Sequence, residues 1–254
     1  MANLTTAPHE FIAARPSWLH KVFWRRYFAW SLRRHFHSGF IAGEDNITSN
    51  TSASEGAALP TIYACTHASW WDAALTIELS LGQYGLDAFG MMEYKQLRKY
   101  SFFSRIGMFS VVREDPASAL YTLRYAASLL RNSARSLWMF PQGELIHQDM
   151  PTLSCEPGIG ILASYLGRCK IVPVAMRYEQ LREQRPSVWI RFGSPFVIDG
   201  SEGVREITSM VSLNMMDVRD QLRSDAMRED NSAYRTFLHG SISMEKRFDR
   251  IMRR

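Results

Sequence analysis

The chain has 254 residues, of which 46% are hydrophobic and 22% charged. These are the proportions of a folded protein rather than a disordered one, with room for one α/β core. The net charge of +5 and the pI of about 9.2 suit an acidic partner such as nucleic acid, an anionic membrane or a phosphorylated substrate.

The cysteines and the apolar runs narrow the class of protein further. Cys65, Cys155 and Cys169 lie far apart and form no C-x-x-C pair, which argues against a disulfide framework and a zinc site. No apolar run approaches the roughly 18 residues of a spanning helix. The N-terminus does not have the pattern of a secretory signal. We therefore expect a protein of a reducing, cytosolic compartment.

The first predicted element is a helix over residues 16–37, with Pro16 in its first turn. Tryptophan, tyrosine, phenylalanine and leucine alternate here with lysine and arginine, and no acid occurs between Glu10 and Glu44. This composition is typical of a helix that lies in a bilayer interface, where aromatic rings insert and basic side chains attract anionic lipid. Packing of the helix on the protein's own core is an alternative.

From this helix we expect residues 1–42 to form an amphipathic membrane-association segment, and removal of residues 1–38 to leave a soluble protein. The protein would then lie on the cytoplasmic face of an anionic membrane, as a peripheral or monotopic protein. A basic aromatic surface for nucleic acid is a further alternative, but no nucleic-acid-binding pattern supports it, and we expect no nucleic-acid partner.

Residues 43–58 are polar and small and are predicted to form a loop before a short buried strand at 61–65. The next residues, 66–72, read THASWWD, after which helical periodicity begins. His67 can take a proton from an alcohol, and Asp72, on the other ring nitrogen, can fix the imidazole tautomer. A helix-start histidine beside an unrelated acid is the alternative.

Two further strands are predicted to end near the same place. A strand over residues 106–113 ends at Arg113, a side chain suited to bidentate phosphate contact, and an apolar strand over 137–140 stops at the turn 141–144. In open α/β sheets, ligands lie beyond the carboxyl ends of the strands. A parallel arrangement would therefore gather His67, Arg113 and Glu144 at one edge of the sheet.

The remaining elements complete an α/β pattern. Further strands are expected near 89–92, at 170–176 and, as the last one, at 188–193. Helices are expected over 94–104, 116–132, 160–166 and 203–228. The sequence GIGILA at 158–163 matches a dinucleotide-binding pattern, but no strand precedes it, so we assign it to a helix entry. We expect one α/β domain over 43–230 and a basic tail over 231–254.

Four blocks in this order resemble those of the phospholipid/glycerol acyltransferase family, which includes the 1-acylglycerol-3-phosphate acyltransferases. THASWWD at 66–72 is similar to N-H-x-S-x-x-D, with Thr66 in place of asparagine, and residues 107–113 are similar to G-x-(I/F)-x-x-x-R. FPQGE at 140–144 is similar to F-P-E-G-T, and IVPV at 171–174 to an apolar V-P-V strand.

The resemblance implies an α/β fold with a mixed, largely parallel sheet flanked by helices, and an N-terminal helical membrane motif. It implies that His67, oriented by Asp72, deprotonates a lipid hydroxyl that attacks the thioester of an acyl-CoA or acyl-carrier protein. It implies no metal, no further cofactor and no covalent acyl-enzyme. The substrate-binding residues carried over from the motifs are Ser69, Arg113, Phe140, Pro141, Gln142, Gly143 and Glu144.

The third block departs from the family pattern, with Gln142 and Glu144 in place of the usual glutamate and threonine. A carboxylate at position 144 near Arg113 would compete with a substrate phosphate for the guanidinium. Two acceptors therefore stay open. One is a lysophospholipid such as lysophosphatidate, and the other a lipid without phosphate such as a glycosylated carotenoid, whose acyltransferases F-P-Q-G variants resemble.

Two other classes of function stay open beside acyl transfer. A serine hydrolase could use Ser69 with His67, but the chain has no G-x-S-x-G sequence. A lipid-binding protein without activity would keep the basic N-terminal helix, yet it has no need for both His67 and Asp72.

Overall fold

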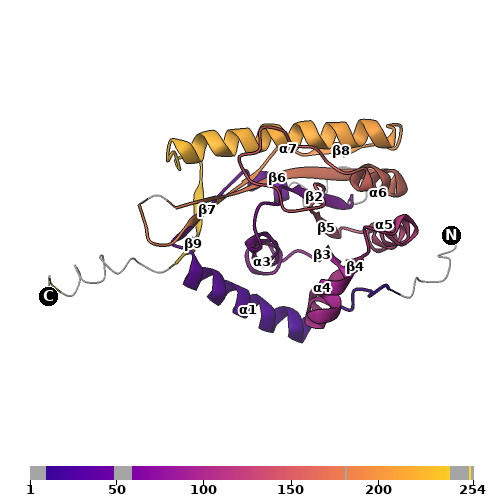
Figure 1. Cartoon of the computed structure of the whole chain (residues 1–254), viewed down its shortest axis with the longest axis horizontal. Helices are drawn as coiled ribbons and strands as arrows, with labels where there is room; N and C mark the ends of the chain where they lie inside the picture. The colour runs from indigo at the N-terminus through magenta and orange to yellow at the C-terminus, as the bar shows by residue number, and fades with distance from the viewer. Residues whose placement is uncertain (1–9, 49–58, 181, 241–251, 253–254) are drawn as a thin grey trace.

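The computed structural model describes residues 10–48, 59–180, 182–240 and 252. These residues form helices on both sides of one mixed sheet (Figure 1). The helices are α1 (Trp18–His35), α2 (Asp45–Thr48), α3 (Trp71–Ile77), the π-helix η1 (Glu78–Gln83), α4 (Tyr94–Lys99), the 3-10 helix η2 (Ser101–Ile106), α5 (Pro116–Leu130), α6 (Gly158–Leu166) and α7 (Val204–Met227). The strands are β1 (Ser38–Ala42), β2 (Thr61–Cys65), β3 (Ala88–Glu93), β4 (Met108–Val111), β5 (Ser136–Met139), β6 (Cys169–Glu179), β7 (Ser187–Phe192), β8 (Phe196–Ile198) and β9 (Arg235–His239).

The strands follow the order β4-β3-β5-β2-β6-β7-β1-β9, and β8 pairs with β6 outside this path. Strands β4, β3, β5, β2 and β6 are parallel to one another. Strand β7 is antiparallel to β6 and parallel to β1, while β8 and β9 are antiparallel to their partners. The mixed, largely parallel sheet is therefore confirmed. It also follows that the carboxyl ends of β2, β4 and β5 lie at one edge.

The central strand β2 is buried on both faces, as its continuous apolar sequence indicates. Side chains alternate along it: Ile62 and Ala64 belong to the core under α5, α6 and α7, whereas Tyr63 and Cys65 belong to the core with α1 and α3. Figure 1 shows α5, α6 and α7 on one side of the sheet and α1, α3 and α4 on the other. The core thus has two layers that hold β2 in the middle.

The starts of two helices have clear local causes. Asp115 caps α5, its carboxylate accepting the Ala117 N–H at 3.0 Å, and Pro116 occupies the first turn. Helix α6 includes Gly160, where a Cβ would lie 2.3 Å from the carbonyl oxygen of Val204 at the start of α7. The GIGILA sequence therefore serves the close packing of α6 on α7.

The predicted N-terminal helix is present as α1, and it packs on the core. Phe28 and Leu32 are buried, and the Trp24 ring stacks on Phe102 of η2 at a centroid distance of 3.7 Å. Other aromatic side chains of the same helix point to solvent, with Trp18 73% and Phe23 62% exposed. Apolar side chains thus occupy the outer side of α1 as well as the inner side. Within the described chain, no helix is long and apolar enough to cross a membrane.

Three strands were not predicted from the sequence. β1 lies within the segment 1–42, and β9 lies within the tail 231–254, yet both join the sheet. The expectation that the strand at 188–193 is the last one was wrong, because β8 and β9 follow it. All three are short, and pairing with distant strands stabilises them. Of the predicted loop 43–58, residues 49–58 lie outside the described residues, as do 241–251 and 253–254 of the tail.

Candidate active site

The main chain of His67 is held on both sides by the segment that follows β5. Its N–H donates to the Oε1 of Gln142 at 2.8 Å, and its carbonyl oxygen accepts the N–H of Ile146 at 2.8 Å. The imidazole stacks on the Phe140 ring with centroids 4.2 Å apart. The turn after β5 therefore fixes the position of His67, although 75 residues separate His67 from Gln142 in the chain.

Asp72 lies at the Nδ1 edge of the imidazole and is fully buried, with 0% of its side chain exposed against 23% for His67. Its Oδ2 lies 2.9 Å from His67 Nδ1 and accepts the N–H groups of Ala68 at 2.8 Å and Ser69 at 2.9 Å. Its Oδ1 accepts a hydrogen bond from the hydroxyl of Tyr178. Because a carboxylate only accepts hydrogen bonds, this contact places the ring proton on Nδ1 and leaves Nε2 as a hydrogen-bond acceptor.

Ser69 has a structural position at the start of α3. Its Oγ accepts the N–H of Trp71 at 3.2 Å, as side chains at helix starts often do. In the described part of the chain no hydrogen bond joins the Ser69 hydroxyl to His67. The local geometry therefore gives no support to Ser69 as a nucleophile activated by His67.

Arg113 reaches the turn that carries the third block. Its Nη1 donates to the carbonyl oxygen of Gly143, which has a φ of +79°. This backbone conformation favours glycine, and a Cβ at this position would lie 2.9 Å from the Arg113 Nη1, so the guanidinium would have to shift. The turn is closed by hydrogen bonds from Gly143 N–H to Phe140 at 3.0 Å and from Glu156 N–H to Pro141 at 2.7 Å.

The sheet edge thus assembles the residues that the sequence motifs single out. His67, Asp72, Phe140 and Gln142 are in direct contact through the bonds and the ring stacking above. Arg113 binds the same turn. Glu144 is exposed, and the ion pairs of the described residues do not include one between it and Arg113. The competition of Glu144 with a substrate phosphate therefore stays a prediction.

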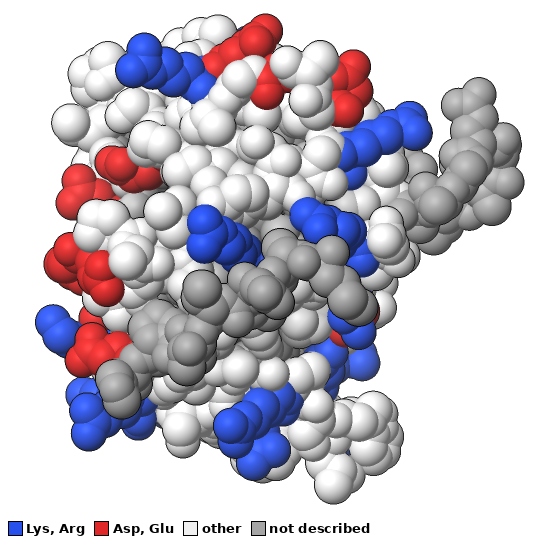
Figure 2. Space-filling model, turned by 90° about the vertical axis from the view of Figure 1, so that its right-hand side faces the viewer, with Lys and Arg blue, Asp and Glu red and all other residues white. Residues whose placement is uncertain are grey.

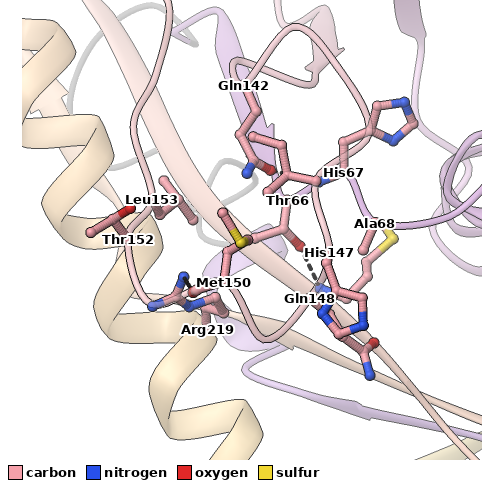
Figure 3. Close-up of a pocket in the computed structure, with 12 residues that line it drawn as sticks. Thr66, His67, Ala68, Gln142, His147, Gln148, Met150, Thr152, Leu153 and Arg219 are labelled. Carbon is pink, nitrogen blue, oxygen red and sulfur yellow. Dashed lines mark hydrogen bonds between the residues drawn. The ribbon is translucent and has the colours of Figure 1, made fainter.

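Three further residues of this region were not predicted from the sequence: Thr66, Gln148 and Tyr178. Thr66 and Gln148 line a small pocket together with Gln142, Met150 and Arg219. In Figure 3 the imidazole of His67 points away from these side chains, so the pocket lies behind its main chain. In the sequence, the only features that point to these residues are Thr66 in place of the asparagine of the first block and the position of Tyr178 after the IVPV block.

The electrostatics of the region follow from burial. Burial and then the charge of Asp72 raise the pKa of Tyr178 well above its usual value, so its hydroxyl stays a hydrogen-bond donor. Burial raises the pKa of the Cys65 thiol just before the motif, which makes a thiolate nucleophile there unfavourable. Among the described residues, no group of three histidine, cysteine, aspartate or glutamate side chains could hold a metal ion.

Comparison with known proteins bears on the fold and the family of this chain. No curated protein sequence matches this chain. The structure is similar to the crystal structure of the 1-acyl-sn-glycerophosphate (LPA) acyltransferase PlsC from Thermotoga maritima. The TM-score is 0.54 at 18% identity, over 80% of this chain and 78% of that chain, and this likeness concerns the fold. The model of the Acyltransferase family matches residues 41–177, more than half of the 254 residues. The chain therefore belongs to the Acyltransferase family.

Proposed function

We propose that this protein transfers a fatty acyl group from a thioester, acyl-CoA or acyl-carrier protein, to the hydroxyl of a lipid acceptor. The observation that carries the proposal is the pair of His67 and Asp72. The buried carboxylate holds Nδ1 at 2.9 Å, and the ring remains partly exposed. Membership of the family supports an acyl donor and an acceptor as substrates.

The proposed reaction follows from the free Nε2 of His67. This nitrogen takes the proton of the acceptor hydroxyl while the oxygen attacks the thioester carbonyl, and a tetrahedral intermediate forms. The intermediate collapses with release of the thiolate, which receives the proton from the imidazolium. Asp72 stabilises the positive charge that the ring carries between these steps. The products are an oxygen ester and a free thiol, with no covalent acyl-enzyme.

For the acceptor we propose a lysophospholipid such as lysophosphatidate. Arg113 is exposed at the edge of the site, and among the described residues only the Gly143 carbonyl receives a hydrogen bond from it. A guanidinium has five N–H donors, so others remain for a phosphate. The Gly143 contact ties the guanidinium to the turn that also holds His67, and this supports binding of an anionic head group near the proposed base.

A lipid acceptor without phosphate, such as a glycosylated carotenoid, is the second candidate. Glu144 favours it, because an exposed carboxylate at the end of this turn can accept hydrogen bonds from sugar hydroxyls. The two candidates differ in the role of Arg113 and Glu144. With lysophosphatidate, Arg113→Ala should raise the KM by roughly 10- to 100-fold, and Glu144→Thr should lower it. With a sugar acceptor, Glu144→Thr should reduce activity and lysophosphatidate should be a poor substrate.

We also propose that the protein works at the cytoplasmic face of an anionic membrane. The exposed aromatic side chains of α1 and the absence of acids between Glu10 and Glu44 support this. Figure 2 shows Lys and Arg side chains beside uncharged ones along the lower part of the molecule, where α1 and α4 lie. Acidic side chains in that view gather toward the left and the top.

The proposed function is tested by thiol release from palmitoyl-CoA with and without a lysolipid. Release that depends on the acceptor supports acyl transfer. Thiol release at the same rate without an acceptor would instead indicate a thioester hydrolase. No thiol release from either a CoA or a carrier-protein donor would indicate a lipid-binding protein without activity. A parallel screen of lysophosphatidate, other lysolipids and glycolipids with radiolabelled acyl-CoA identifies the acceptor.

A further inference from the structure

The Asp72 carboxylate has a hydrogen-bond partner from the part of β6 that follows the IVPV block. Tyr178 lies near the end of β6, and its hydroxyl donates to Oδ1, the oxygen that does not face the imidazole. The other oxygen, Oδ2, accepts from the main chain of Ala68 and Ser69 and faces His67. The two carboxylate oxygens are therefore anchored from opposite sides, one by the motif itself and one by Tyr178.

The place of Tyr178 is set by side chains that continue the sheet after β2 has ended. The paired residues of β2 and β6 stop at Cys65 opposite Val174. Beyond that point the Met176 N–H donates to the Oγ1 of Thr66 at 3.0 Å. The Tyr178 N–H donates to the Oε1 of Gln148 at 3.0 Å, and the Nε2 of Gln148 donates back to the Tyr178 carbonyl at 3.0 Å.

These contacts satisfy main-chain groups that would otherwise lack partners at the end of the strand. Thr66 and Gln148 thus bond the side of β6 that β2 no longer covers, while β7 pairs with the other side up to Glu179. The Tyr178 ring packs against Phe36 with centroids 5.9 Å apart, which limits its motion from the side of α1. Main chain and ring together direct the hydroxyl to Asp72.

We propose that Tyr178 is a positioning residue for the pair of Asp72 and His67, held in place by Thr66 and Gln148. The inference rests on the proposed function. Without the hydroxyl, Oδ1 of a fully buried carboxylate loses its donor, and the carboxylate can turn about its last side-chain bond. The Oδ2 contact that fixes the Nδ1 proton of His67 then loses its alignment. Tyr178 acts through Asp72 and does not contact the substrate.

Tyr178→Phe tests this inference because it removes only the hydroxyl. We expect kcat to fall by roughly 10- to 100-fold, the range for loss of one hydrogen bond to a charged group, while KM for both substrates changes by less than about twofold. The acidic limb of the kcat profile should move to lower pH. The reason is that a carboxylate that has lost its alignment on Nδ1 stabilises the imidazolium less strongly. A folded Tyr178→Phe protein with the kcat and pH profile of wild type would overturn the inference.

Tyr234→Phe is the matched control. The Tyr234 hydroxyl also donates to a carboxylate, that of Asp225 at 2.8 Å, and the residue contacts Arg191 and Trp189. None of these residues belongs to the site. The control therefore loses the same kind of hydrogen bond, and its kcat and pH profile should match those of wild type.

A second variant and a second measurement keep the test independent of folding and of the proposed reaction. Gln148→Met removes the side chain that bonds the main chain of Tyr178. It should lower kcat by a smaller factor than Tyr178→Phe does. A wild-type kcat in this variant would contradict the role of Gln148 in holding Tyr178. In proton NMR, the downfield Nδ1–H signal of His67 should shift or broaden in Tyr178→Phe and stay in Tyr234→Phe. If wild type transfers no acyl group, the proposed reaction fails, whereas an unchanged Nδ1–H signal contradicts the positioning role alone.

Discussion

At the scale of single residues, the site is built around a buried negative charge. Asp72 has no exposed surface, and burying a carboxylate is unfavourable unless it is hydrogen-bonded. Two main-chain N–H groups, the Tyr178 hydroxyl and His67 supply these bonds. The same contacts that stabilise the charge also fix the tautomer of His67, so structure and chemistry depend on one carboxylate.

Substitution of His67 by alanine should abolish most acyl transfer and leave the fold intact. General-base catalysis typically contributes about 10²- to 10⁴-fold to the rate, and kcat should fall by a factor in this range. Asp72→Asn should also lose most activity, because an amide cannot accept all the hydrogen bonds that the carboxylate accepts. The rates are measured beside thermal unfolding. His239→Ala, which changes an exposed histidine of β9, is the control, and wild-type rates in folded His67→Ala would contradict the mechanism.

At the scale of elements, two helices on the far side of the sheet depend on one glycine. A Cβ at Gly160 would lie 2.3 Å from the Val204 carbonyl and 2.5 Å from Thr208 Oγ1, both in the first turns of α7. Gly160→Ala must push α6 and α7 apart. We expect it to lower the free energy of unfolding by roughly 1–3 kcal/mol, the usual range for overpacking.

Urea unfolding of Gly160→Ala and Gly158→Ala measures this effect on the same helix. A Cβ at Gly158 would meet only Met139 at 3.5 Å and Leu123 at 4.0 Å, which are ordinary contacts. Alanine also favours a helix over glycine by up to about 1 kcal/mol. Gly158→Ala should therefore be neutral or slightly stabilising, and equal stability of the two variants would contradict the packing role of Gly160.

The position of α1 changes how membrane association has to be tested. The expectation that removal of residues 1–38 leaves a soluble protein took the segment to be separate from the core. Leu32 and Phe36 are fully buried, and Phe36 packs against Trp71 of α3. Deletion would expose the core that they cover. Substitutions on the exposed side of the helix avoid this problem.

Replacing Trp18, Phe23 and Trp30 together by serine should strongly reduce sedimentation with anionic phosphatidylglycerol vesicles. These rings are 73%, 62% and 54% exposed, so the fold does not need them, whereas a bilayer interface does. High salt should release wild type only in part, because screening weakens the attraction of arginines but not insertion of rings. Leu213→Ser, at an exposed position of α7, is the control. Wild type that stays in the supernatant would refute the prediction.

At the scale of the whole molecule, the end of the described chain is tied back to its beginning. Arg235 of β9 donates to both carboxylate oxygens of Glu44, at 2.8 and 2.6 Å, across 191 positions of sequence, and the Tyr84 hydroxyl donates to the same carboxylate at 2.7 Å. These bonds join β9, the second residue after β1 and the residue that follows η1. They also make stability depend on pH.

Hydrogen bonding to Arg235 lowers the pKa of Glu44 below its usual value of 4.5, so the folded state binds its proton less tightly than the unfolded state. The resulting stabilisation is complete above the unfolded pKa and is lost as the pH falls through the folded pKa. Because Arg235 is about half exposed, we expect Glu44→Gln to cost no more than about 1 kcal/mol near pH 7. Urea unfolding should show that the difference from wild type vanishes in acid. Glu114→Gln, at an exposed acid, should show no such difference.

The sequence by itself determined the parts that depend on short stretches of chain. His67 and Asp72 are five positions apart at a change from strand to helix, so their pairing is local. Arg113 and the turn at 140–144 come from separate strands. Their meeting could be expected because parallel strands end at one edge. Buried strands such as β2 were recognisable from continuous apolar sequence.

Only the tertiary structure decided the contacts that join distant segments. Tyr178 reaches Asp72 over 106 positions, and no local pattern marks a tyrosine as a partner of a carboxylate so far away. Strands β1 and β9 have few residues and polar neighbours, and they exist because they pair with each other and with β7. A side-chain pattern records which face of an element is buried. It does not record which remote group will satisfy a particular donor or acceptor, because that choice depends on how the whole sheet is ordered.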